Sequence, residues 1–132
     1  MDNKHQAGHE KMIVWKSIEE LTTITNEILE CIPKDKYKSI SQIENALDSA
    51  GANFVEGYYS GCLGEYIKFI KYAHRSCAEL LTRVTNQRLR GVIGENIFEK
   101  FKERCVKTMY LLDRTRQSLE LKRDADPKKT KK

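Results

Sequence analysis

The stretch from Leu63 to Val84, LGEYIKFIKYAHRSCAELLTRV, carries the most regular apolar pattern in the chain. Its apolar residues recur at steps of three and four, the spacing that places side chains on one face of an α-helix. They are Leu63, Tyr66, Ile67, Ile70, Ala73, Cys77, Leu80, Leu81 and Val84. The stretch therefore predicts a long amphipathic helix that begins near Cys62, and it decides the fold class.

Three further stretches show the same periodicity. They run from Met12 to Ile32, from a cap at Ser39 or Ser41 to Gly57, and from about Gly94 to Leu121. Pro33 ends the first of them, because proline disfavours helical geometry in the residue before it. No stretch shows sustained alternation of apolar and polar residues, so no β-sheet is expected.

Four amphipathic helices joined by short loops predict an all-α, up-down-up-down antiparallel four-helix bundle. Residues 12–121 form the bundle domain in this interpretation. Residues 1–11 and 122–132 are too polar to fold alone and are expected to be a disordered N-terminal segment and a disordered basic tail. The alternation of directions places the loop at Lys34–Lys38 and the turn at Arg88–Gly91 at the same end of the bundle.

Length and composition restrict the class of protein. The chain has 132 residues, 39% of them hydrophobic and 33% charged, which indicates one soluble domain without a membrane span. Its first residues, MDNKHQAGHEK, contain no apolar segment of a secretory signal, so a cytoplasmic protein is expected. The four cysteines form no CxxC pair, so neither a zinc ribbon nor a redox dithiol is indicated.

The net charge of +5 is unevenly placed. The last eleven residues, KRDADPKKTKK, hold six cations and two anions, so the tail carries most of the excess positive charge. Basic tails of this kind attach proteins to nucleic acid through phosphate contacts. Lys128 and Lys129 are therefore candidate nucleic-acid contacts.

A second group of cations is predicted to gather at one end of the bundle, against Asp35 alone. Its members are Lys34, Lys36, Lys38, Arg88 and Arg90. Such a cluster is a candidate site for the phosphates of RNA or DNA. The alternative interpretation is an ordinary solvated loop end, because lysine is common in the loops of charged chains.

The motif ANFVEGYYSG, residues 52–61, is predicted to form the corner between the second and third helices. Asn53 and Glu56 can satisfy unpaired backbone groups at the two helix ends. Gly57 is expected to be a left-handed cap, and Gly61 a tolerant residue at the next helix start. A catalytic role for Glu56 is the weaker alternative.

Three aromatic residues lie near this corner: Trp15, Tyr58 and Tyr59. They are candidate contacts in an oligomer interface, or half-buried lids over the end of the bundle. Two histidines, His5 and His9, have helical metal-ligand spacing, but their segment has no apolar stripe to form a helix, so no metal site is predicted. Known catalytic and cofactor-binding motifs are missing from the sequence, so neither an enzyme nor a cofactor is expected.

The order of landmarks along the chain resembles one family. They are Val14-Trp15, Glu20-Leu21, Ile32-Pro33, Ser41-Gln42-Ile43, the block Asn53-Phe54-Val55-Glu56-Gly57, Glu65-Tyr66, Phe69-Ile70, Ala73, Ser76 and Glu79-Leu80. This order is similar to that of the bacterial four-helix-bundle proteins encoded in intervening sequences of large-subunit ribosomal RNA genes. The accessory variability determinant proteins of diversity-generating retroelements are similar to that family.

The resemblance implies a non-enzymatic bundle that assembles as a ring-shaped homopentamer. In the retroelement branch, it also implies binding to nucleic acid and to a reverse transcriptase. The chain departs from the family pattern where relatives have arginines, which correspond here to Glu44, Asn45 and Ser60. We therefore expect an adaptor that binds nucleic acid at its basic end. The alternative is a protein-interaction module without nucleic-acid contact.

Overall fold

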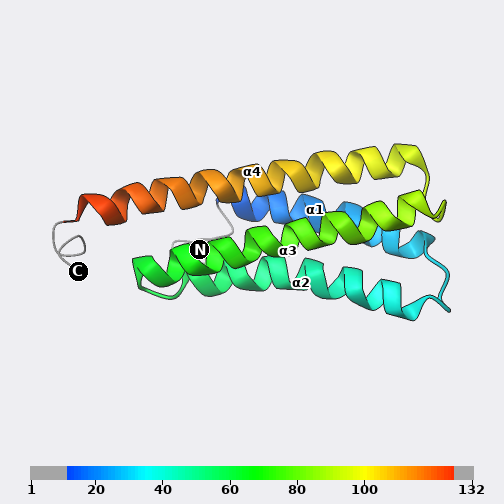
Figure 1. Ribbon diagram of the computed structural model, residues 1–132, viewed down its shortest axis with the longest axis horizontal. Helices are drawn as coiled ribbons and strands as arrows, with labels where there is room; N and C mark the ends of the chain where they lie inside the picture. The colour runs from blue at the N-terminus through cyan, green and yellow to red at the C-terminus, as the bar shows by residue number, and fades with distance from the viewer. Residues whose placement is uncertain (1–11, 127–132) are drawn as a thin grey trace, which may run out of the picture.

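A computed structural model describes residues 12–126, and the regular structure in this range is entirely helical (Figure 1). Helix α1 spans Ile13–Cys31, α2 Tyr37–Tyr58, α3 Leu63–Leu89 and α4 Glu95–Ala125. The helices pack in the cyclic order α1, α2, α3, α4, which forms a four-helix bundle. None of the helices in this range is long and apolar enough to cross a membrane. The predicted all-α class is confirmed for the described residues.

The apolar stripes of the four helices meet in one core. Each helix contributes at least one large side chain that is fully buried, among them Leu21, Phe54, Leu80 and Phe101. Burying a side chain of this size contributes roughly 1.5–3 kcal/mol each to the free energy of folding. The periodicity from which the helices were predicted is therefore the pattern of core contact.

Two hydroxyl pairs between helices help fix how the helices are aligned along their axes. Ser17 on α1 bonds Thr108 on α4 through their hydroxyl oxygens, which lie 2.6 Å apart in the buried interior. Ser49 on α2 and Ser76 on α3 form a similar pair at 2.8 Å. Because a buried hydroxyl without a partner is costly, sliding either helix pair along its axis is disfavoured.

The bounds of two helices differ from the prediction. Helix α2 begins at Tyr37 rather than after a serine cap, because the amide of Ile40 already donates to the carbonyl of Lys36 at 3.2 Å. Helix α4 continues to Ala125, so Lys122–Ala125 do not belong to a disordered tail. No glycine or proline interrupts α4 there, and Lys122 and Arg123 complement the partial negative charge of its C-terminus.

Several predictions fall on residues outside the described range. These are the proposed disorder of residues 1–11 and 127–132, the paired histidines His5 and His9, and the candidate contacts Lys128 and Lys129.

The prediction that Gly57 is a left-handed cap is wrong, because Gly57 lies inside α2. A Cβ atom at this position would lie 2.9 Å from the Cβ of Phe69 and 3.2 Å from the carbonyl oxygen of Tyr66. Only glycine lets α2 and α3 approach so closely. The left-handed residue of the corner is Gly61, whose φ is 74°.

The two glycines of α2 provide a matched test of this packing. We expect Gly57→Ala to lower the free energy of unfolding by about 1–3 kcal/mol, because its methyl group would overpack the contact with α3. At Gly51 the nearest atoms to a new Cβ are 3.8 Å away, an ordinary contact. Gly51→Ala should therefore raise the free energy of unfolding by about 0.5–1 kcal/mol, because alanine favours helix.

Urea denaturation followed by circular dichroism measures both changes. Equal shifts in the same direction would contradict the close approach at Gly57.

Candidate functional site

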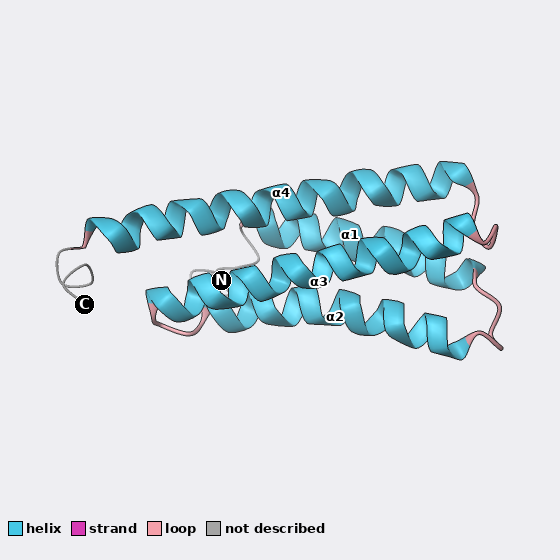
Figure 2. Cartoon of the chain, in the orientation of Figure 1, coloured by secondary structure: helices cyan, strands magenta, loops and turns pink. Residues whose placement is uncertain are grey.

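One end of the bundle carries most of the cations that the sequence analysis grouped. Lys34 and Lys36 lie between α1 and α2, Lys38 lies in the first turn of α2, and Arg90 follows α3; all four are exposed. The connection between α1 and α2 and the connection between α3 and α4 both lie at this end (Figure 2). Arg90 lines the same pocket as Ser39, the residue after Lys38. We call the group of Lys34, Lys36, Lys38 and Arg90 the basic end.

Arg88, the fifth predicted member of the cluster, is already paired with a carboxylate. Its guanidinium forms an ion pair and a hydrogen bond with Glu95 in the first turn of α4. The hydrogen bond from Arg88 lowers the pKa of the Glu95 carboxyl. The sequence analysis missed this pairing because the two residues lie on either side of the turn between α3 and α4.

The three lysines of the basic end have no carboxylate within ion-pair distance in the part of the chain that the structure describes. Several cations elsewhere on the bundle are paired. The pairs are Lys68–Glu65, Lys71–Glu120, Arg83–Glu79, Lys107–Glu20 and Arg116 with both Asp113 and Glu120. The hydrogen bond from Arg116 also lowers the pKa of Asp113. The lysines of the basic end thus remain available for an external anion.

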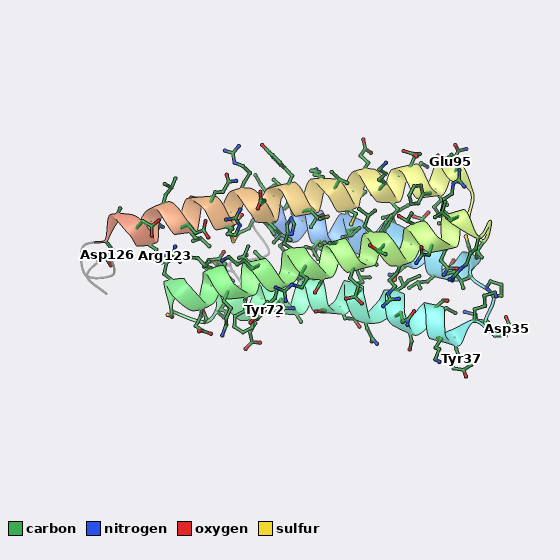
Figure 3. The ribbon with its side chains drawn as sticks, in the orientation of Figure 1. Asp35, Tyr37, Tyr72, Glu95, Arg123 and Asp126 are labelled. Atoms are coloured by element: carbon green, nitrogen blue, oxygen red, sulfur yellow. The ribbon has the colours of Figure 1, made fainter. Side chains whose placement is uncertain are left out.

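Tyr37 adds an aromatic ring to this end that the sequence analysis did not assign to the site. It is the first residue of α2 and is 73% exposed, and Figure 3 shows it at the same end as Asp35. An exposed ring between two lysines can stack on a base while the lysines contact phosphates. The sequence does contain a signal for this assignment, because Tyr37 is an aromatic residue in the Lys34–Lys38 segment and belongs to no apolar stripe.

The corner at the opposite end has a structural explanation that differs from the predicted one. Asn53 does not cap a helix end; its side-chain amide donates to the carbonyl of Ser49 at 2.8 Å and to its hydroxyl at 3.0 Å. The Ser49 hydroxyl in turn bonds Ser76 on α3. Glu56 is exposed and lines a groove between α1 and α2 rather than a helix end.

The three aromatic residues near this corner have different surroundings. Trp15 stacks on Phe54 with ring centroids 6.3 Å apart, and its indole N–H donates to Glu19 at 3.1 Å. Tyr58 is half-buried, with its ring centroid 6.0 Å from that of Tyr66, so it packs as a lid. Tyr59 is 53% exposed. An oligomer contact through these residues stays a prediction.

Comparison with known proteins gives one finding. The family described as 23S rRNA-intervening sequence protein matches residues 10–114, which include α1 to α3 and most of α4. No curated protein and no solved structure matches the chain.

The cysteines show where the described part of the chain is chemically reactive. Cys77 and Cys105 are buried between α3 and α4, where the Cys105 thiol donates to the carbonyl of Cys77 at 3.4 Å. Burial raises the pKa of Cys105 to about 12 and raises that of Cys77 further. Cys31 and Cys62 are exposed. Nucleophilic chemistry at the buried pair is therefore disfavoured, because the thiolate is the reactive form.

Alkylation tests this arrangement. With iodoacetamide at pH 8, we expect Cys31 and Cys62 to be modified while Cys77 and Cys105 stay unmodified. At a pKa of about 12 only about one Cys105 thiol in ten thousand is ionised at this pH. Peptide mass spectrometry identifies the modified residues, and the same reaction in urea is the control in which all of these thiols react. Modification of Cys77 at the rate of Cys31 in the native protein would contradict the buried packing.

Proposed function

The chain belongs to the 23S rRNA-intervening sequence protein family, and we propose that it is a non-enzymatic adaptor that binds nucleic acid through its basic end. The observation that carries the proposal is the set of lysines at positions 34, 36 and 38, which are exposed and have no carboxylate partner in the described range. Cations held without a partner at the surface are available to replace the counterions of a phosphate backbone.

The proposed binding mode uses the side chains of the basic end in two ways. Lys34, Lys36, Lys38 and Arg90 contact successive phosphates, so that affinity falls as the salt concentration rises. Tyr37 supplies a face on which an unpaired base stacks. This combination favours single-stranded or loop segments of RNA or DNA over regular duplexes, whose bases are already stacked.

We also propose that the bundle assembles as a homo-oligomer, with a ring-shaped pentamer as the implied form. Exposed apolar side chains on α1 and α4 support an assembly, namely Ile13, Val106, Tyr110 and Leu121. A ring would repeat the basic end around its axis. Because the repeated sites are joined in one assembly, their weak contacts with one nucleic acid would combine into a higher overall affinity. A reverse transcriptase is a further proposed partner, by similarity to the accessory proteins of retroelements.

A protein-interaction module without nucleic-acid contact is the second candidate function. It is favoured by the outer face of α4, where the apolar side chains of Val106 and Tyr110 are exposed. Their exposed apolar surface would suit another protein better than a phosphate backbone. Removing cations from the basic end separates the two candidates.

We expect the variant Lys34→Ala/Lys36→Ala/Lys38→Ala to bind a single-stranded RNA at least about tenfold more weakly than the unchanged protein at low salt. Because each lost phosphate contact removes about 0.7 from the slope of log affinity against log salt, three contacts should make the slope about two units shallower. Fluorescence anisotropy at several salt concentrations measures both quantities.

The matched control is Lys16→Ala/Lys68→Ala/Lys71→Ala, which removes the same charge from the rest of the bundle. It should retain the slope and most of the affinity. Equal losses of affinity in the two variants would show that only net charge matters and would refute a defined basic end. No RNA or DNA binding by the unchanged protein would favour the interaction module.

A further inference from the structure

An apolar ridge runs along the outer face of α4. Val106 and Tyr110 are 47% and 57% exposed and lie one helical turn apart. Within residues 12–126 they are the only two large exposed apolar side chains with that spacing. Single exposed apolar residues are ordinary on a protein surface, whereas adjoining ones form a patch that another surface can cover. We call this pair the α4 ridge.

Two cations flank the α4 ridge. Lys102 lies one turn before it and Arg114 one turn after it, and neither forms an ion pair in the described part of the chain. Arg114 donates to the Tyr110 hydroxyl at 3.1 Å and lies 5.9 Å from the centroid of its ring. The same face also carries two carboxylates and a lysine that is paired with α1, namely Glu99, Glu103 and Lys107. Both ends of the ridge therefore present a positive charge to any covering surface.

A recessed surface of the opposite charge lies between α1 and α2, the most loosely packed pair of neighbouring helices. Its accessible walls are Trp15, Gly51, Ala52 and Val55. A Cβ atom at Gly51 would lie 3.9 Å from the Trp15 ring, so the missing side chain leaves a hollow beside the indole. The charged residues that line this surface are Asp48 and Glu56, and neither has a cation within ion-pair distance in the described range. We call it the α1–α2 groove.

The two surfaces complement one another in shape and charge. A raised aromatic ring between cations matches a hollow between carboxylates, and such complementarity selects the correct partner. The ridge belongs to α4 and the groove to α1 and α2, so every copy of the chain carries both halves of one contact.

We propose that the α4 ridge of one copy docks in the α1–α2 groove of a second copy, an inference that rests on the homo-oligomer proposed above. The ring of Tyr110 then lies beside Trp15 and over Gly51, and Lys102 and Arg114 face the carboxylates of the groove. Because the two halves are different surfaces, the contact is heterologous. Each added copy leaves one ridge and one groove open until the assembly closes as a ring.

Two variants of the full chain each damage one half of the contact. Ala52→Arg places a long cationic side chain in the groove, and Tyr110→Glu replaces the ring by a carboxylate that the groove repels. Both positions are exposed, so the melting temperature measured by circular dichroism should change little. Light scattering after size-exclusion chromatography should give each variant the mass of one chain, at a concentration where the unchanged protein is an oligomer.

An equimolar mixture of the two variants gives the sharpest result. The Tyr110→Glu copy keeps an intact groove and the Ala52→Arg copy keeps an intact ridge, so one copy of each should pair. At high micromolar concentration the mixture should reach the mass of two chains and no more, because the remaining ridge and groove are both altered. The controls Tyr72→Glu and Thr82→Arg introduce the same charges at exposed residues of α3 and should leave the assembly unchanged.

The outcomes separate this inference from the assembly on which it rests. If either variant keeps the mass of the unchanged protein, or if the controls also lose the assembly, the proposed contact is wrong while the homo-oligomer stands. A mixture that stays at the mass of one chain, or grows beyond two, also overturns the contact. An unchanged protein with the mass of one chain would refute the homo-oligomer itself, and the inference with it.

Discussion

The close contact between α2 and α3 at Gly57 is the constraint that sets how these two helices pack where they join. A methyl group at this position would overlap the side chain of Phe69 and crowd the side chain and carbonyl oxygen of Tyr66, so only glycine lets the two helices approach so closely there. The pocket lined by Ser39 and Arg90 lies at the opposite end of the same pair, between the start of α2 and the end of α3.

Periodicity along the sequence predicted which faces of the helices are buried, and the core residues of α3 confirm it. It could not predict how closely two helices approach, because that distance depends on residues from both of them. Periodicity therefore predicts a cap at Gly57, although in the structure this residue makes room for Phe69. The early start of α2 was missed for a related reason, since a backbone turn after Pro33 begins that helix without a side-chain cap.

The candidate site was predicted in part, because topology alone places the two loops at one end. Topology does not show which individual charges pair with one another. Arg88 counts as a cation in the sequence but is held by Glu95 in the fold, whereas Lys34 and its neighbours keep their charge available. The burial of Gln87, which lines the same pocket as Arg90, could not be foreseen either, because a glutamine within a helix is usually exposed. Both corrections depend on contacts between segments that are separate in the sequence.

The central claim is that the basic end, rather than the outer face of α4, is where nucleic acid binds. Hydrogen–deuterium exchange of the protein with and without single-stranded RNA, read by mass spectrometry, tests this most directly. The account predicts slower exchange in peptides from Lys34 to Gln42 and from Arg83 to Gly94, with α4 from Lys102 to Tyr110 unchanged. Slower exchange confined to that part of α4, with the basic end unchanged, would contradict it.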